Sequence, residues 1–284
     1  MSSPIETEVL HEWMLKVLTR KGQFAADAEL VIARLLEAEQ RGSITGGLTT
    51  FAEILTAIDL GDVDPRARTL TVTDAPAIAV LDGSTGIGQV GASRAMQLAV
   101  QKASLTGIAL VVVKNSQPLV DVAGIAALAA KEHCLGFCTA NWGKADRDTA
   151  SGWLSSQPQA WAMPHGQNVW ITSSNLSGIE SIAAGVLSLV LTAGLTDSKL
   201  PAAKKRASPF GAGAEYACIA IHPATMGTTE SLTRIGDELT ASDGAAGWSA
   251  FPVGPLQDTF SLAPNVLGAL IEAGQAARVP FPAA

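Results

Sequence analysis

The stretch Ile108-Ala109-Leu110-Val111-Val112-Val113 decides the fold class, because a continuous Val-rich apolar run is typical of a strand buried on both faces. Residues 78–81 before it and residues 135–140 after it have the same strand-like composition. Helical patterns follow Gly83 and cover residues 123–131. This β-α-β-α-β order predicts an α/β fold in which a layered mixed sheet is flanked by helices.

The remaining segments extend this core in both directions. Toward the N-terminus, helical spacing covers residues 5–19, a segment from Asp27, and residues 50–60, and residues 69–73 alternate like a strand. Toward the C-terminus, the patterns predict strands at 160–163, 169–172 and 216–221, and helices from Ile179, at 230–239 and at 262–276. We therefore expect an N-terminal helical part (1–75) packing on the core, a central α/β domain (76–230), and a C-terminal helical part (231–284) returning to the N-terminal region.

The amino-acid composition and net charge argue against several classes of function. The hydrophobic fraction is 48% and the charged fraction only 16%, which suits a large core and a large interface between identical subunits. The net charge of −7 argues against nucleic-acid binding. The longest apolar run, residues 179–195, contains Glu180 and is short for a membrane span. Because the N-terminus reads as an acidic amphipathic helix and not as a signal peptide, we expect a cytoplasmic protein without membrane contact.

Cysteine and histidine spacing gives no support for a metal site. The three cysteines, Cys134, Cys138 and Cys218, form neither a disulfide framework nor a zinc pattern, and we interpret them as buried, inert thiols. The four histidines, His11, His133, His165 and His222, have no HxxxH or HExxH spacing. No metal is therefore expected.

Gly86-Ile87-Gly88-Gln89-Val90-Gly91 fits the G-x-G-x-x-G pattern of dinucleotide-binding loops. Three polar residues separate it from the preceding strand, and the next strand ends in Lys114-Asn115 with no acidic residue for a ribose. A turn that leads into a helix is the better interpretation, so we do not predict a Rossmann site.

Several segments, in order and spacing over residues 5–195, resemble the type-2 malate/L-lactate dehydrogenase family. Four parts of the chain carry most of this resemblance. They are the acidic helix end Glu37-Ala38-Glu39-Gln40-Arg41-Gly42, the pair Leu81-Asp82-Gly83 and Gly86-Ile87-Gly88, the strand end Val113-Lys114-Asn115-Ser116, and the stretch Pro158-Gln159-Ala160-Trp161-Ala162-Met163-Pro164. The match weakens toward Ala220-Ile221-His222-Pro223. The resemblance implies a fold distinct from the Rossmann arrangement, NAD or NADP as cofactor, a homodimer, and a small 2-hydroxy, 2-amino or imino acid as substrate.

The chain departs from this family where the family carries its catalytic groups. Gly46 stands at the position of the family histidine that handles the substrate proton, and Thr50 at that of the arginine that binds the substrate carboxylate. Pro118 replaces a second histidine, and Ser177 replaces a lysine. Glycine and proline cannot transfer a proton, and threonine cannot make the bidentate contact of an arginine. The resemblance thus implies a divergent, shortened member without ordinary 2-hydroxy-acid dehydrogenase activity.

Two hypotheses remain open. In the first, the chain is an enzyme with altered chemistry, which includes a cofactor-free lyase, cyclase or isomerase; in the second, it is a catalytically silent relative that binds a small molecule or a protein. Under the first, the candidate catalytic residues are Lys144, Asp146 and Gln117, and the candidate substrate-binding residues are Thr45, Thr50, Asn115, Arg147 and His165. A surviving NAD(P) site would involve Ser116, Pro158, Ser173 and Ser174 by family position, with Trp170 as a candidate obstruction. The polar patch around Lys144 can equally be a solvated turn.

Overall fold

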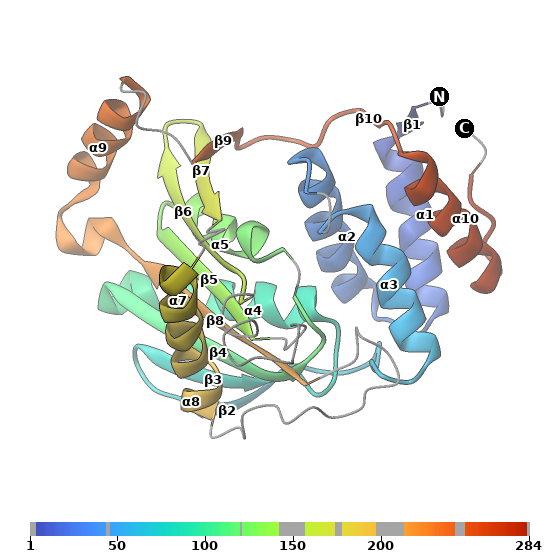
Figure 1. Ribbon diagram of the computed structural model, residues 1–284, viewed down its shortest axis with the longest axis horizontal. Helices are drawn as coiled ribbons and strands as arrows, with labels where there is room; N and C mark the ends of the chain where they lie inside the picture. Colours follow the sequence, from blue (N-terminus) through green and yellow to red (C-terminus); the bar gives the residue numbers. More distant parts are fainter. Residues whose placement is uncertain are drawn as a thin grey trace.

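A mixed sheet forms the centre of the molecule in the computed structural model (Figure 1), which describes residues 4–43, 46–119, 121–141, 157–173, 178–196, 213–241 and 248–282. Its strand order is β2-β3-β4-β8-β5-β6-β7-β9. These strands are β2 (Leu70–Asp74), β3 (Ile78–Asp82), β4 (Ile108–Ser116), β5 (Leu135–Asn141), β6 (Gln159–His165), β7 (Asn168–Ser173), β8 (Ala214–Ile221) and β9 (Ser249–Pro252).

The late strand β8 makes the sheet mixed. β3 and β4 are parallel neighbours, whereas β8 lies between β4 and β5 and runs antiparallel to both. As a result β3, β4 and β5 all end at one edge of the sheet, and β8 and β6 begin there. This edge collects the polar strand ends described below.

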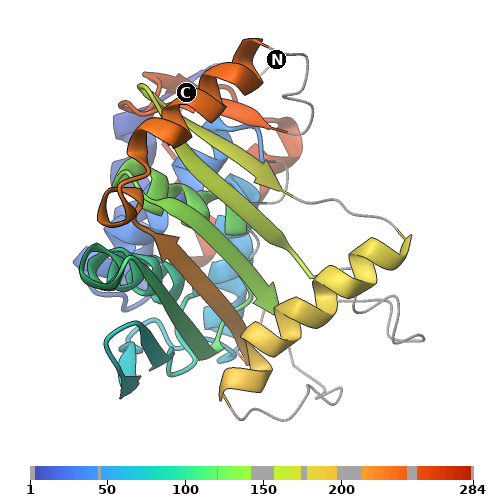
Figure 2. The ribbon, with the colours of Figure 1, turned by 90° about the vertical axis from the view of Figure 1, so that its left-hand side faces the viewer.

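Helices cover both faces of the sheet (Figure 2). On one face, α4 (Gly88–Thr106) packs on β4 and β8, and α5 (Val122–Lys131) packs on β5, β6 and β7. On the other face, α7 (Gly178–Leu191) contacts β5 and α8 (Ala193–Thr196) contacts β4. Small residues allow close packing on the α4 and α5 side, since a Cβ on Gly136 would collide with the Ala126 carbonyl oxygen.

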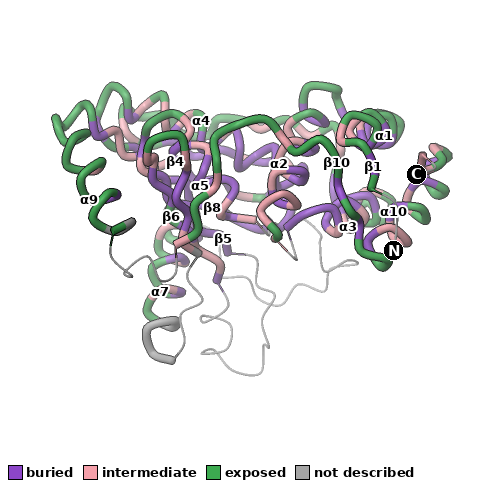
Figure 3. The backbone as a smooth tube through the Cα atoms, turned by 90° about the horizontal axis from the view of Figure 1, so that it is seen from above, coloured by how far each residue is buried: buried purple, intermediate pink, exposed green. Residues whose placement is uncertain are grey.

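A second, helical layer lies beside the sheet (Figures 1 and 3). It contains α1 (Thr7–Arg20), α2 (Ala25–Gln40), α3 (Leu48–Asp59) and, from the other end of the chain, α10 (Pro264–Ala276). The helices share a buried apolar cluster separate from the cluster between the sheet and α4/α5. The short strands β1 (Ile5–Glu6) and β10 (Thr259–Phe260) pair next to α1.

The exposed helix α9 (Thr229–Ala241) contacts β6 and the 3-10 turn η1 (Pro223–Met226), at the far end of the molecule from α10 (Figures 1 and 3). The chain then returns through β9 to the helical layer. Among the described helices, none is long and apolar enough to cross a membrane.

The expected fold class, a layered mixed sheet with flanking helices and not a Rossmann fold, is confirmed. The structure differs from the expectations at the ends of some helices and in its short strands. Residues 5–6, expected at the start of a helix, form β1, because β10 supplies backbone partners that no local pattern reveals. The helix expected after Gly83 begins at Gly88, and β9 and β10 have no counterpart among the expected strands. All three cysteines are buried and unpaired, as expected.

Candidate functional site

The sheet edge where β3, β4 and β5 end holds several of the residues expected to be functional. Ser116 pairs with Ala214 across β4 and β8, and Asn141 pairs with Glu215 across β5 and β8. Pro158 lies against the same edge, since its carbonyl oxygen accepts hydrogen bonds from the Ala140 amide (3.1 Å) and the Thr139 hydroxyl (2.9 Å). The fold therefore brings strand ends from distant parts of the sequence together.

Asn115 and Ser116 differ in their accessibility. Asn115 is exposed, adopts a left-handed backbone conformation (φ 55°), and its amide donates to the Asp82 carboxylate at 3.2 Å. Ser116 is 0% exposed, and its hydroxyl donates to the Gly86 carbonyl oxygen at 3.3 Å. Asn115 can reach a ligand in this arrangement, whereas the Ser116 hydroxyl is engaged inside the protein.

Gln117 directly follows β4 and is 3% exposed. Its backbone amide donates to the Gly86 carbonyl oxygen (3.0 Å), but its side-chain Oε1 is buried without a hydrogen-bond partner among the described residues. A buried amide oxygen without a partner costs about 1–3 kcal/mol. Gln117 is therefore the expected catalytic candidate with the clearest unmet polar capacity in the described part of the chain.

Gly46, at the position of the expected family histidine, lies in a tight turn. A Cβ at Gly46 would come within 2.7 Å of the Asp121 Cβ and 2.8 Å of the Ser43 hydroxyl. Next to it, the Glu39 carboxylate accepts from the Leu48 amide (2.8 Å) at the start of α3 and fills the space beside Gly47. Thr50, at the expected arginine position, is buried in α3. The space for a side chain at residue 46 is thus occupied.

Asp121 and Arg41 form a buried ion pair at this turn. The Asp121 carboxylate also accepts from the Gly124 amide (3.1 Å) and so caps α5. Burial raises the pKa of Asp121 above its ordinary value, although Arg41 and the Gly124 amide act in the opposite direction. The sequence analysis did not single out Asp121. Arg41 belongs to the Glu37–Gly42 motif, but no sequence pattern indicated that Asp121 is its partner.

A second buried polar group lies on the face of the sheet covered by α7 and α8. The Glu215 carboxylate accepts hydrogen bonds from the Thr196 hydroxyl (2.7 Å) and the Asn141 amide (3.3 Å). Nearby, the Thr139 and Ser188 hydroxyls are 2.5 Å apart. The pairing of Glu215 with these partners was also absent from the sequence-based expectations, because residues 141, 196 and 215 meet only in space.

The structure does not bring every candidate to this edge. His165 lies at the opposite edge of the sheet, where its imidazole contacts the Asp237 carboxylate (3.0 Å) and the Trp170 ring (5.4 Å between centroids). Trp170 is therefore also remote from Ser116. Five further candidates lie outside the described residues: Thr45, Lys144, Asp146, Arg147 and Ser174.

Two of the residues expected to line an NAD(P) site, Ser116 and Pro158, already bind protein partners. The Ser116 hydroxyl is buried and bonded to Gly86, and the Pro158 carbonyl oxygen already accepts two hydrogen bonds. Ser173 pairs with Ala160 at the end of β7. The Ser116 hydroxyl and the Pro158 carbonyl oxygen therefore face protein partners.

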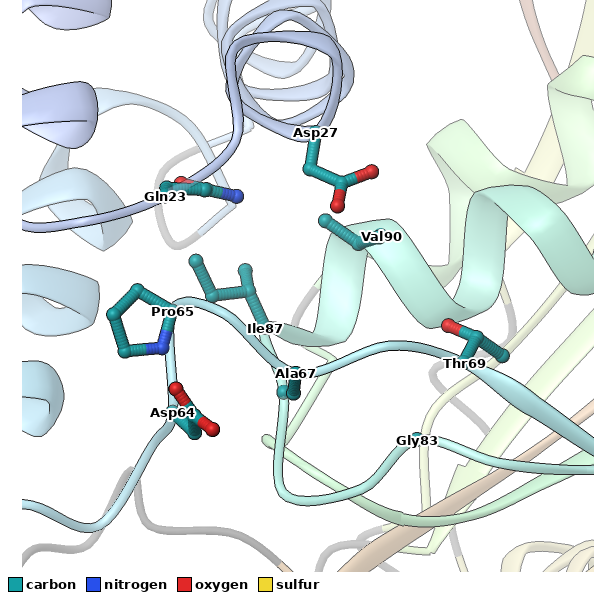
Figure 4. Close-up of a pocket in the computed structure, with 10 residues that line it drawn as sticks. Gln23, Asp27, Asp64, Pro65, Ala67, Thr69, Gly83, Ile87 and Val90 are labelled. Atoms are coloured by element: carbon teal, nitrogen blue, oxygen red, sulfur yellow. The ribbon is translucent and has the colours of Figure 1, made fainter.

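The glycine turn before α4 is also tightly packed. Figure 4 shows residues that line the small cavity beside it, including Asp27 and Asp64. A Cβ on Gly86 would lie 2.9 Å from the Ala67 Cβ, and one on Gly88 would lie 2.7 Å from the Gln117 carbonyl oxygen. The cavity beside the turn measures about 10 Å³, and the carboxylates of Asp27 and Asp64 line it. That volume holds at most about one water, and the glycines allow close packing against Ala67 and Gln117.

Histidine, cysteine and carboxylate side chains do not gather into a metal-binding group anywhere in the described ranges, where no three of them form a cluster.

Comparison with known proteins identifies relatives of this chain. The family model described as malate/L-lactate dehydrogenase matches residues 5–172. Malate dehydrogenase of Pyrococcus abyssi is 33% identical over 137 residues, which cover 48% of this chain and 38% of that relative. L-Sulfolactate dehydrogenase of Methanocaldococcus jannaschii is 30% identical over 128 residues, covering 45% and 37%. The matched segment thus spans well under half the length of these relatives.

Solved structures resemble the fold over almost the whole chain. The sulfolactate dehydrogenase of Methanocaldococcus jannaschii superposes with a TM-score of 0.80 at 18% identity and 98% coverage of both chains. The malate dehydrogenase of Entamoeba histolytica superposes with a TM-score of 0.79, also at 18% identity, with 99% of this chain and 100% of that chain covered. At such low identity the likeness shows a shared fold.

Proposed function

Since the chain belongs to the malate/L-lactate dehydrogenase family, we propose that it is an enzyme that uses this scaffold for altered chemistry on a small carboxylic, amino or imino acid. The observation that carries this proposal is the turn at Gly46, where the Asp121 side chain and the Ser43 hydroxyl occupy the space next to the backbone. An imidazole cannot stand there, so the proton transfer that such a group would perform must come from another residue.

The proposal assigns acid-base work to Lys144 or Asp146 and carboxylate binding to Arg147, which follow the edge at Asn141 in the sequence. Gln117 is assigned a direct polar contact, supported by its unpartnered buried oxygen. Asn115, Thr45 and Thr50 complete the proposed substrate contacts. Asp121 is not assigned the proton transfer, because it already binds Arg41 and the Gly124 amide.

The proposed chemistry does not require NAD or NADP, although either could serve as a cofactor. The burial of Ser116 and the engaged carbonyl of Pro158 favour chemistry that needs no nicotinamide, such as lyase, cyclase or isomerase steps. The same observations favour the second candidate function, a catalytically silent subunit that binds a small molecule or a protein.

Nucleotide titration separates these versions. Tryptophan fluorescence is followed while NADH or NADPH is added, and malate, lactate and sulfolactate are tested in separate assays for oxidation with NAD+ or NADP+. We expect neither saturable quenching nor turnover. Robust oxidation of malate or lactate with a nicotinamide would overturn the altered chemistry.

Pyruvate binding tests the proposed carboxylate contact. We expect saturable binding that weakens by about 10- to 100-fold in Arg147→Ala, because a charge-assisted hydrogen bond is lost. Arg206→Ala, in the basic run 204–206, is the matched control and should bind normally. Equal binding by both variants would remove Arg147 from the site. Binding of neither pyruvate nor nucleotide would favour the silent subunit.

The proposed assembly is a homodimer in the cytoplasm. It is supported by exposed apolar side chains on α7, namely Val186, Leu187 and Val190, which water solvates poorly. Three unpaired, buried cysteines suit a reducing compartment. Sedimentation velocity should give twice the mass of the chain, and a monomer at micromolar concentration would contradict the dimer.

A further inference from the structure

A second pocket lies between the helical layer and the sheet, and it borders the Arg41–Asp121 ion pair next to the Gly46 turn. It measures about 70 Å³ and opens between α2, α5, β7 and the chain that follows β9. We refer to it as the α2–α5 pocket. Its lining comprises Glu37, Gln40, Arg41, Ala127, Lys131, Val169, Ile171, Phe251, Pro252, Gly254 and Leu256.

The polar side of the α2–α5 pocket carries an excess of positive charge. Glu37 forms ion pairs with Arg34 (2.9 Å) and Lys131 (2.8 Å), and Arg41 pairs with Asp121. Among the residues that line the pocket, Lys131 and Arg41 are cations and Glu37 is a carboxylate, which leaves a surplus of one positive charge. The Arg41 and Glu37 side chains are 11% and 20% exposed, so water screens their charges weakly, whereas the Lys131 side chain is 33% exposed and its charge is partly screened.

Hydrogen bonding in this cluster is also incomplete. Arg34 Nε and Nη1, outside the pocket lining, and Glu37 Oε2 have no hydrogen-bond partner among the described residues, although Glu37 Oε2 forms an ion pair with Arg41 Nη1 at 4.0 Å. The Lys131 ammonium, which has three donor hydrogens, makes one recorded bond, to Glu37 Oε1. Buried charged groups in native proteins are normally satisfied, so the cluster is electrostatically suited to one additional anionic acceptor.

The opposite wall of the pocket is apolar. Val169 and Ile171 of β7 are buried, and Phe251 and Leu256 are partly buried beside them. Gly254 and Pro252 lie at the exposed rim, where a ligand can enter. A ligand that fits therefore has one charged end and a short hydrocarbon end.

We propose that the α2–α5 pocket binds a short aliphatic monocarboxylate, with its carboxylate between Lys131 and Arg41 and its hydrocarbon chain against Val169, Ile171 and Phe251. A volume of about 70 Å³ suits a carboxylate with two or three carbons attached. The singly charged headgroup matches a surplus of one positive charge. The Glu37 carboxylate in the lining repels a doubly charged anion such as phosphate.

A chain-length series tests the proposal on the full protein. Acetate, propanoate and butanoate are titrated at low ionic strength, and binding is followed by saturation-transfer NMR. We expect affinity to rise about fourfold for each added methylene, because each one is removed from water. Inorganic phosphate should bind more weakly than butanoate. No saturable binding of butanoate, or phosphate binding as tight as butanoate, would overturn the proposal.

Matched variants locate the ligand. Lys131→Met should weaken butanoate binding by about 10- to 100-fold, through loss of a charge-assisted hydrogen bond. Lys102→Met removes the same charge from α4, where Lys102 binds the Asp74 carboxylate (2.5 Å) outside the pocket lining, and should leave binding unchanged. Equal losses in both variants would show that only overall charge matters and would contradict the site.

A steric variant keeps the test informative if Lys131→Met does not fold. Ala127→Leu adds carbon atoms to the pocket wall while leaving every charged group in place, and should abolish butanoate binding. Binding retained in folded Ala127→Leu would contradict the proposal. Gln117→Leu alters the proposed active site, not this pocket. It should leave butanoate binding intact, which separates a failure here from a failure of the proposed function.

Discussion

Gly46 has no side chain, and the space around it is filled by the Asp121 Cβ and the Ser43 hydroxyl. The Asp121 Cβ belongs to the residue that caps α5, so it cannot move without disturbing the ion pair with Arg41. The packing at this position therefore leaves no room for a larger side chain unless its neighbours rearrange.

Gly46→Ala should lower the free energy of unfolding by about 1–3 kcal/mol, because the new methyl group overpacks the turn. Gly268→Ala is the matched control: no atom lies within 4 Å of the new Cβ, and the substitution falls inside helix α10. It should stabilise the protein by about 0.5–1 kcal/mol. Urea unfolding of both variants measures these changes, and the same sign for both would contradict the packing described at Gly46.

Cys134 links stability to alkaline pH. Burial raises the pKa of its thiol from 9.0 to about 11. The folded state therefore favours the protonated thiol, so its contribution is complete below pH 9.0 and is lost as the pH rises toward about 11. Over this pH range the free energy of unfolding should fall by up to about 3 kcal/mol. Urea unfolding between pH 8 and pH 11 should show a steeper loss for the wild type than for Cys134→Ala; parallel curves would contradict this assignment.

At the scale of elements, α8 is tied to the sheet through one buried hydrogen bond. The Thr196 hydroxyl donates to the Glu215 carboxylate of β8 at 2.7 Å. Ser188 of α7 makes a comparable contact with Thr139 of β5. These bonds orient both helices over the edge where β5 ends and β8 begins.

Thr196→Val keeps the shape of the side chain but removes the donor to Glu215. We expect a loss of about 1.5–3 kcal/mol in the free energy of unfolding, typical of a hydrogen bond to a charged group. Thr233→Val in α9, where the hydroxyl donates only locally to the Thr229 carbonyl oxygen, should stay within about 0.5 kcal/mol of the wild type. Thermal unfolding compares the two, and a silent Thr196→Val would show that the carboxylate does not depend on this donor.

At the scale of the molecule, the C-terminal segment completes the core of the N-terminal helices. Phe260, Leu262, Val266 and Leu270 belong to the same buried cluster as α1, α2 and α3. The division into parts 1–75, 76–230 and 231–284 remains a proposal. α9 packs on β6, so the return to the helical layer begins only after it.

Leu270→Ala should cost about 2–5 kcal/mol, because this side chain is 0% exposed and its removal leaves a cavity. Its neighbour Ile271 is 37% exposed, and Ile271→Ala should cost less than about 1 kcal/mol. Hydrogen exchange should show that Leu270→Ala weakens amide protection in α1 and α3 as well as in α10. Loss confined to α10 would mean that the two chain ends do not share one cooperative core.

Local patterns in the sequence determined the elements and the fold class. The apolar run 108–113 predicts β4, and helical periodicity predicts α1 to α5, because burial on one face or on both faces leaves a local signature. The family motifs, and the expectation that Gly46 and Thr50 replace family residues, likewise come from the sequence, since they need only residue identity and order.

Tertiary structure alone decided which of these residues meet. Four features depend on contacts between segments that are distant in the sequence. They are the insertion of β8 between β4 and β5, the contact of Asp121 with Gly46, the Glu215 carboxylate beside Thr196, and the placement of His165 at the far edge. Such contacts follow from the packing of whole layers, which no short stretch of residues encodes.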